Sequence, residues 1–213
     1  MIRENHITIN KTARFYTLGE LNENTRQVWI VIHGFRQLAK DFLMGFEPLS
    51  NSTNFFIAPE GLNRFYMDKQ GTAVVATWMT REDRLNEIKD YINYLDSLYT
   101  SFSLAKFKGT ITALGFSQGA STVTRWLDVT KNRVDRAVVY AGEVAPELLP
   151  LRDDSGLKRT RNYFVYGNQD KFITPDKLDA LKADYHALNF TVMPFEGKHE
   201  INVSSLQSLV ELQ

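Results

Sequence analysis

The chain has 213 residues, of which 43% are hydrophobic and 23% are charged, and its 25 basic side chains balance its 25 acidic ones. This composition is typical of a folded globular protein with one sizeable core, so we expect a single domain over residues 1–213. The balanced charge offers no basic patch for nucleic acid, and the lack of cysteine excludes disulfides, thiolate metal sites and a cysteine nucleophile.

The beginning of the sequence is polar and lacks the apolar core of a signal peptide. No apolar run is long enough to span a membrane. We therefore expect a cytoplasmic protein, and the sequence leaves open whether it is a monomer or a dimer.

The first part of the chain predicts short strands and one helix. Residues 6–10 and 14–18 each alternate apolar and polar side chains, which predicts an antiparallel hairpin at a sheet edge. Residues 27–32 form a continuous apolar run, the pattern of a strand buried on both faces in a parallel sheet. A helix is expected over residues 38–46, and a second buried strand over residues 54–58.

The segment from Glu60 to Thr80 shows no clear hydrophobic period but is rich in aromatic residues. Such a stretch is either a functional loop or a loop that its aromatic side chains pack onto the core. Beyond it, apolar residues recur every three or four positions up to Tyr99, which predicts an amphipathic helix with Thr80 as its N-cap.

The second half of the chain alternates strands and helices regularly. Strands are predicted over residues 110–114, 136–141, 161–166 and 190–195, and helices after Ser117 and over residues 175–188 and 204–212. This alternation predicts an α/β fold with a doubly wound, mostly parallel sheet and helices on both faces.

Ser117 stands at the junction of a predicted strand and a predicted helix, in the run Gly115-Phe116-Ser117-Gln118-Gly119. A sharp strand–helix turn presents the serine hydroxyl beyond the sheet, and small residues on either side avoid a clash in that turn. The pattern therefore favours a nucleophilic serine. The alternative is an ordinary strand–helix turn in which the serine is a helix N-cap.

Asp170 and His199 also follow predicted strands, and the carboxyl ends of parallel strands are where an open sheet places its chemistry. The chain order serine, aspartate, histidine is that of the hydrolase form of the catalytic triad. We therefore expect Ser117 as nucleophile, His199 as base and Asp170 as the acid that orients His199. Asp176 is the nearest rival for the acid and His33 for the base.

Backbone N–H groups should stabilise the negative charge that develops on a substrate oxygen. We expect those of Gln118 and Phe35 to form this oxyanion hole. Apolar side chains of Phe35, Trp78, Phe172 and Ile173 are expected around the nucleophile as the substrate pocket; alternatively, they seal the loops against the sheet. No two histidines have metal-ligand spacing, so no metal site is expected.

The motifs together resemble the phospholipase/carboxylesterase group of α/β hydrolases, which includes acyl-protein thioesterases. The residues that carry the resemblance are His33-Gly34, Ala58-Pro59, Trp78, the run around Ser117, Gly167-x-x-Asp170 and Gly197-x-His199. It implies a minimal α/β-hydrolase fold without a cap domain and a serine esterase that needs no cofactor, with Ser117, Asp170 and His199 in the roles above.

One departure from the group concerns the oxyanion loop. The group usually has His-Gly-x-Gly-Asp, whereas this chain has Arg36 and Gln37 in place of the second glycine and the acid. Because this loop borders the acyl site, the departure bears on the substrate and leaves the backbone donor in place.

These observations predict a serine hydrolase that cleaves carboxylic esters of short or medium acyl chain through an acyl-serine intermediate. Two alternatives remain: an acyl-protein or small thioesterase on the same triad, and a non-catalytic protein that binds small molecules with the same fold. In each case the expected partner is a small molecule, with no nucleic acid.

Overall fold

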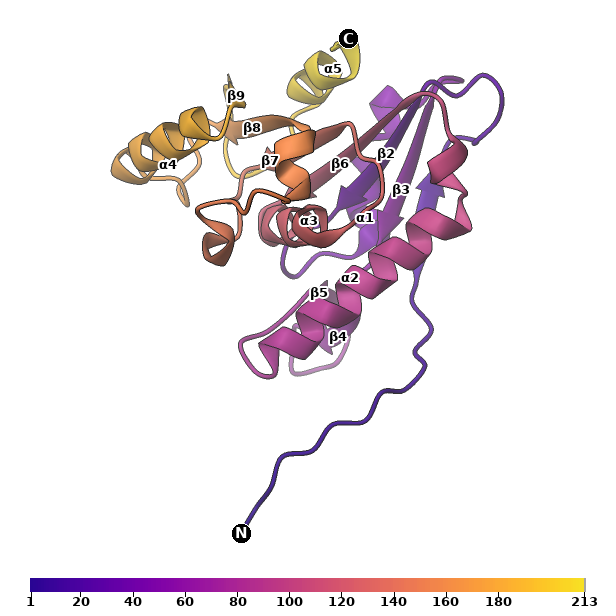
Figure 1. Cartoon of the computed structure of the whole chain (residues 1–213), viewed down its shortest axis with the longest axis vertical. Helices are drawn as coiled ribbons and strands as arrows, with labels where there is room; N and C mark the ends of the chain where they lie inside the picture. The colour runs from indigo at the N-terminus through magenta and orange to yellow at the C-terminus, as the bar shows by residue number, and fades with distance from the viewer. Residues whose placement is uncertain (213) are drawn as a thin grey trace.

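The computed structural model describes residues 1–212, and Gln213, the last residue of the predicted domain, lies outside the described residues. Its centre is a seven-stranded sheet with the order β1-β3-β2-β6-β7-β8-β9 (Figure 1). All neighbouring strands are parallel except β1, which pairs antiparallel with β3. The strands are β1 (Phe15–Leu18), β2 (Gln27–Ile32), β3 (Asn54–Pro59), β6 (Thr110–Phe116), β7 (Arg136–Tyr140), β8 (Arg161–Gly167) and β9 (Phe190–Phe195).

Helices cover both faces of this sheet, as the sequence predicted. One hydrophobic core contains buried residues of α2, α3 and α4, and the core on the opposite face contains those of α1 and α5. The helices are α1 (Ala39–Met44), α2 (Arg84–Ser101), α3 (Gln118–Val129), α4 (Pro175–Ala187) and α5 (Val203–Glu211), with short 3₁₀ turns at Glu47–Leu49, Leu104–Lys106, Pro146–Leu148 and Gly156–Arg159.

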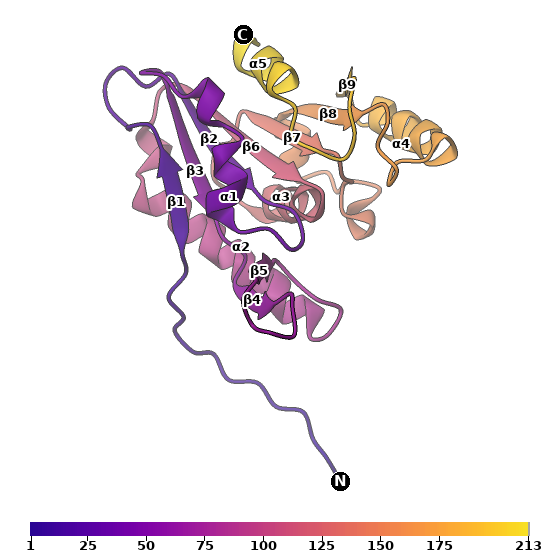
Figure 2. The same cartoon turned by 180° about the vertical axis from the view of Figure 1, so that it is seen from behind.

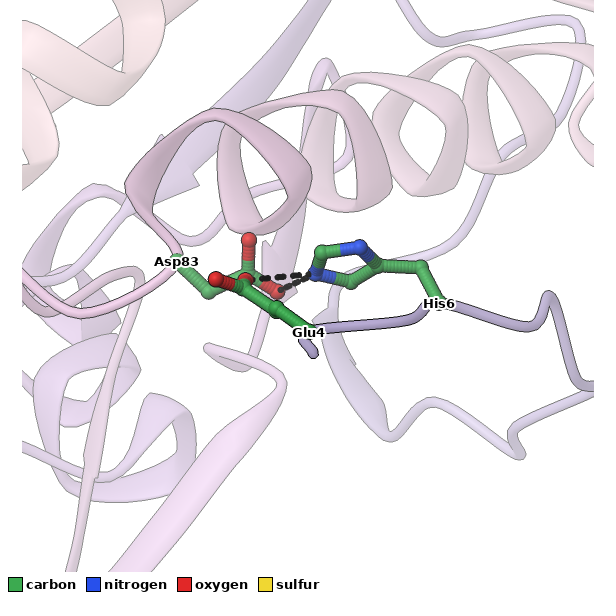
Figure 3. Close-up of side chains that lie close together, drawn as sticks. All are labelled: Glu4, His6 and Asp83. Atoms are coloured by element: carbon green, nitrogen blue, oxygen red, sulfur yellow. Dashed lines mark ion pairs between the residues drawn. The ribbon is translucent and has the colours of Figure 1, made fainter. Parts of the chain in front are cut away.

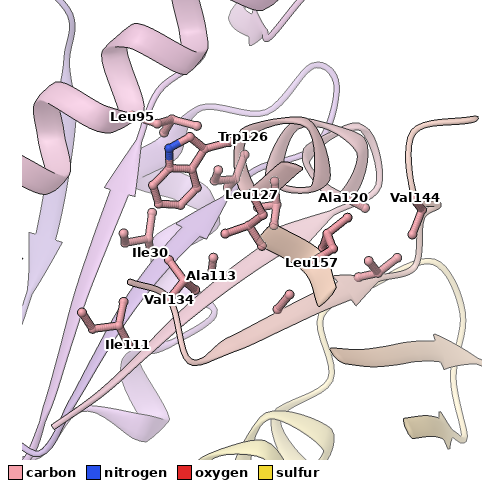
Figure 4. Packing of buried hydrophobic residues seen from close by; sticks show 14 of the residues in the cluster. Ile30, Leu95, Ile111, Ala113, Ala120, Trp126, Leu127, Val134, Val144 and Leu157 are labelled. Carbon is pink, nitrogen blue, oxygen red and sulfur yellow. The ribbon is translucent and has the colours of Figure 1, made fainter. Parts of the chain in front are cut away.

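The helix that follows Ser117 is the most deeply buried of these. Trp126 of α3 is fully buried among residues such as Leu95 of α2 and Ile30 of β2 (Figure 4). Its indole N–H donates to Asp96 Oδ1 at 2.8 Å, so the polar atom of this large side chain is satisfied. This packing holds α3, and with it Ser117, firmly against the sheet.

The prediction of an N-terminal hairpin is wrong. Residues 6–10 form no strand, and the chain before β1 runs away from the sheet (Figures 1 and 2). Ile7 and Ile9 are 87% and 75% exposed, so their alternation buries nothing. The predicted second strand does form, as β1, but β3 is its partner.

Two further differences concern the segment between β3 and α2. It contains an antiparallel pair that the aperiodic sequence did not predict, β4 (Asn63–Tyr66) with β5 (Val74–Thr77). The helix α2 begins at Arg84, with Asp83 rather than Thr80 in the N-cap position. Thr80 instead donates its N–H to Glu87 Oε2 at 2.5 Å. No helix within residues 1–212 has the length and apolar character that crossing a membrane requires.

Candidate active site

Ser117 occupies a sharp turn between β6 and α3, with a backbone φ of 53° and ψ of −116°. Its N–H donates to Tyr140 O of the neighbouring strand at 2.9 Å. A Cβ atom at Gly115 would lie 2.1 Å from Gly119 O, and one at Gly119 would lie 2.2 Å from Ile32 O. Only glycine therefore fits on either side of the serine, which explains the spacing seen in the sequence.

Three polar side chains from three strand ends form one chain of hydrogen bonds. His199 Nε2 lies 3.0 Å from Ser117 Oγ, and His199 Nδ1 lies 2.7 Å from Asp170 Oδ2. The Asp170 side chain is fully buried, and its second oxygen accepts the N–H of Phe172 at 2.9 Å. The rings of Phe172 and Phe116 pack against the imidazole at 4.7 and 4.9 Å between centroids. The structure thus brings the three predicted residues together in the predicted order.

The rival residues lie in other surroundings. Asp176 is exposed in the first turn of α4, where a carboxylate interacts favourably with the helix dipole. His33 is completely buried: its Nδ1 lies 2.7 Å from Gly34 O, and its Nε2 accepts the N–H of Gly61 at 3.0 Å. Nδ1 therefore bears the proton, and burial lowers the pKa of His33. Both ring nitrogens are engaged, so His33 shapes the loop rather than transfers protons.

The predicted oxyanion loop, which follows β2, is held by hydrogen bonds of its backbone and of Gln37. The side-chain oxygen of Gln37 accepts the N–H of Gly34 at 2.7 Å, the role a carboxylate would fill. Arg36 has a φ of 64°, the left-handed conformation that suits glycine, and its N–H donates to Ala76 O at 3.0 Å. Among the described residues, the N–H of Phe35 has no hydrogen-bond partner, so it is available to a ligand.

The N–H of Gln118 is equally available, because the first residue of a helix has no intrahelical acceptor for it. The Gln118 side chain fixes this position: its oxygen accepts the N–H of Trp78 at 3.2 Å, and its nitrogen donates to Met79 O at 3.1 Å. The Trp78 indole in turn donates to His33 O at 2.9 Å. These bonds, which the sequence did not predict, connect both parts of the predicted oxyanion hole.

A cavity of about 600 Å³ opens beside Ser117 and His199. Phe35, Phe172 and Ile173 line it, as predicted. Trp78 does not: it is 1% exposed and packs beneath the oxyanion loop, so its predicted place in the pocket is corrected. The remaining lining residues are Ser121, Ala141, Gly142, Glu143, Pro146 and Lys177.

The sequence contained a signal for some of the lining residues that were missed. Ser121 lies four residues after Ser117, so the two share a face of α3. Glu143 follows the end of β7, at the same sheet edge as the other site residues. Lys177 gave no such signal, because the periodicity of α4 does not say which of its polar residues faces the cavity.

One group of side chains in the described chain has a metal-binding composition, and it is separate from this cavity. His6 Nε2 lies 3.2 Å from Glu4 Oε1 and 3.3 Å from Asp83 Oδ2 (Figure 3). All three residues are exposed, and exposed ion pairs of this kind are common on protein surfaces. The group shares no residue with the cavity beside Ser117.

The sequence profile of a family described as serine hydrolase (FSH1) matches residues 30–207, which include every residue of the hydrogen-bonded chain. The chain belongs to the FSH1 serine hydrolase family. A search of curated proteins gives no match. The family match thus confirms the prediction, made from the motifs, that the chain is a serine hydrolase.

Solved structures show that this FSH1 family member has the fold of known esterases. Zea mays acyl-protein thioesterase 2 is similar with a TM-score of 0.68 and 13% identity, over 93% of this chain and 96% of that one. The Bacillus cereus carboxylesterase gives 0.67 and 16%, over 95% and 93%. The Paleococcus ferrophilus monoacylglycerol lipase gives 0.63 and 14%, over 94% and 98%. The predicted α/β-hydrolase fold is confirmed.

Proposed function

We propose that this serine hydrolase cleaves carboxylic esters of short or medium acyl chain through an acyl–Ser117 intermediate. The observation that carries the proposal is the continuous chain of hydrogen bonds from Asp170 through His199 to Ser117. A serine hydroxyl is a weak nucleophile at neutral pH, and such a chain provides the base that activates it and the acid that orients the base.

In the first half of the reaction, His199 Nε2 takes the proton of Ser117 as Oγ attacks the ester carbonyl carbon. Asp170 Oδ2 accepts a hydrogen bond from Nδ1–H, which keeps Nε2 free as the base and stabilises the imidazolium that forms. The tetrahedral intermediate then expels the alcohol, which receives the proton from Nε2. The products of this half are the free alcohol and the acyl–Ser117 ester.

The negative oxygen of the tetrahedral intermediate requires donors that are already in place. The free N–H groups of Phe35 and Gln118 supply them, one from the oxyanion loop and one from the N-terminus of α3. In the second half, water attacks the acyl ester, His199 takes the water proton, and Ser117 Oγ leaves with that proton as the acid is released.

The acyl group fits the apolar part of the cavity. Phe35, Phe172 and Ile173 provide apolar walls, and the charged side chains of Glu143 and Lys177 in the same lining favour a chain of short or medium length. Phe172 and Phe35 are 57% and 52% exposed, so the mouth is open and a substrate enters without a cap domain moving aside.

A thioester would react on the same atoms with a thiol as the leaving group. Two of the similar structures represent both substrate classes, since one is a carboxylesterase and the other an acyl-protein thioesterase. The hydrogen-bonded chain of Ser117, His199 and Asp170 argues against a non-catalytic binding protein, because ligand binding alone does not require this arrangement. The predicted cytoplasmic location stays a prediction.

A fluorophosphonate probe tests the nucleophile directly. We expect covalent labelling of the wild-type protein and none of Ser117→Ala, with Ser121→Ala as the matched control because Ser121 lines the same cavity. Absence of labelling in folded wild type, or equal labelling of Ser117→Ala, would overturn the proposal. Nitrophenyl esters of increasing chain length and an acyl thioester, tested on the same preparation, then identify the acyl and leaving groups.

A further inference from the structure

The cavity has a charged wall on the side away from the oxyanion loop. At the carboxyl edge of the sheet, Phe35 follows β2, Ser117 follows β6, Glu143 follows β7 and Lys177 belongs to the helix after β8. The strand order β2-β6-β7-β8 therefore places Phe35 and the Glu143–Lys177 pair on opposite sides of the nucleophile. Glu143 and Lys177 form an ion pair, and both line the cavity.

The loop that contains Glu143 is held in place by side chains around it. Ser121 Oγ donates to Glu143 O at 3.0 Å, and the N–H of Val144 donates to Tyr185 OH at 2.9 Å. The N–H of Ala145 donates to Thr124 Oγ1 at 3.1 Å. Three consecutive residues are thus fixed through their backbone, so the direction from which Glu143 projects is set by α3 and α4.

Lys177 connects this loop to the loop after β8. Its ammonium contacts Glu143 Oε1 and also lies 3.5 Å from Phe172 O, in the loop after β8. The Lys177 and Glu143 side chains are 41% and 36% exposed, so the pair keeps part of its hydration. Three apolar residues of the cavity lining lie close to the pair along the chain: Ala141 and Pro146 on either side of Glu143, and Ile173 four residues before Lys177.

We propose that the Glu143–Lys177 ion pair ends the acyl subsite and sets the longest acyl chain the enzyme accepts. This inference rests on the proposed function of the Ser117 site. A methylene group that packs against the apolar wall leaves water and strengthens substrate binding. A methylene group that reaches the ion pair displaces water from two charged groups and cannot replace the hydrogen bonds which that water made. The gain in binding free energy per added methylene therefore ends at the ion pair.

The magnitude follows from the transfer of methylene groups out of water. Each methylene that becomes buried is worth about a fourfold gain in kcat/KM. If removal of the charge exposes apolar wall for two further methylenes, the preference for a longer ester rises about fifteenfold. The gain should appear mainly in KM, because the acyl tail binds equally in the ground and transition states.

The test compares kcat/KM for nitrophenyl decanoate with that for nitrophenyl butyrate. Lys177→Met retains most of the stem and removes the ammonium charge, and we expect its decanoate/butyrate ratio to exceed the wild-type ratio by about fifteenfold. Glu143→Gln should shift the ratio in the same direction, and Lys177→Arg should keep the wild-type ratio because the pair is preserved. The matched control is Lys158→Met, since Lys158 is also 41% exposed and pairs with Asp153 at 2.9 Å outside the cavity.

The split between KM and kcat gives an independent readout that a merely structural role would not move. The gain of Lys177→Met on the decanoate should lie in KM with kcat nearly unchanged, because the acyl tail binds equally in the ground and transition states. An unchanged ratio in Lys177→Met, or an equal change in Lys158→Met, would overturn the inference. The proposed function fails separately, by loss of fluorophosphonate labelling and of all ester hydrolysis in the wild type.

Discussion

Replacing Asp170 with asparagine tests the orientation of His199, because the structure determines which end of the new amide faces the imidazole. One oxygen of Asp170 accepts the N–H of Phe172 at 2.9 Å, and the other lies 2.7 Å from His199 Nδ1. The asparagine oxygen must remain on the Phe172 N–H, since the amide nitrogen there would place a donor against a donor. The NH₂ group then donates to Nδ1, and the imidazole proton moves to Nε2.

A histidine protonated at Nε2 cannot accept the proton of Ser117, whose Oγ lies 3.0 Å from that nitrogen. By comparison with measured triads, turnover should fall about 10⁴-fold, which corresponds to roughly 5 kcal/mol of transition-state stabilisation. The two side chains have nearly the same size, and the Phe172 hydrogen bond is preserved. We therefore expect Asp170→Asn to fold as the wild type does.

The assay is kcat on nitrophenyl butyrate, with thermal melts followed by circular dichroism on the same samples. Asp176→Asn is the matched control, because Asp176 is exposed in the first turn of α4 and should cost only about 0.3–1 kcal/mol of stability. The reasoning is refuted if folded Asp170→Asn keeps more than about a tenth of wild-type turnover. It is equally refuted if Asp176→Asn is the variant that loses activity.

Three further predictions concern the framework of the site. Gln37→Ala should lower the free energy of unfolding by about 1–3 kcal/mol, because the N–H of Gly34 loses its acceptor. Gln37→Glu should leave the free energy of unfolding unchanged, because the carboxylate still accepts this N–H. Urea unfolding of both variants measures the difference. Gly119→Ala should lower the free energy of unfolding by about 1–3 kcal/mol or more, since its Cβ would lie 2.2 Å from Ile32 O. An unchanged melting temperature would contradict this. Burial lowers the pKa of His33, so below about pH 6.5 the unfolded chain binds a proton that the folded chain does not. Stability should therefore fall as pH decreases from about 7 to 5, by at most about 1.4 kcal/mol per pH unit from this group, and His33→Gln should show a shallower fall in urea unfolding at each pH.

The parallel part of the fold could be predicted because its strands are buried on both faces. Residues 28–32 of β2 are continuously apolar, which distinguishes this strand from a surface strand with alternating polar residues. The failures lie where pairing rather than burial decides the structure. Residues 6–10 alternate like a strand but find no partner, and β4 and β5 form a hairpin that no hydrophobic period marks. The local sequence pattern does not determine which other strand a given strand pairs with.

The chain of Ser117, Asp170 and His199 could be placed because each residue follows a strand of a parallel sheet, so topology alone brings them to one edge. Trp78 was misplaced because an aromatic residue near a site can either line a pocket or pack beneath the loop that borders it. The sequence does not distinguish these two positions. The bonds of the Gln118 side chain depend on the position of a segment some forty residues earlier, which no local rule supplies.

The backbone at Ser117 has a consequence for how this enzyme would respond to selection. Its φ of 53° and ψ of −116° lie in a region that residues with a Cβ avoid, at a cost on the order of 1–3 kcal/mol. Glycine would adopt that conformation without the cost but has no hydroxyl. If Ser117 is the nucleophile as proposed, stability and reactivity are opposed at this position: selection for melting temperature alone would favour glycine here, and selection for turnover would keep serine.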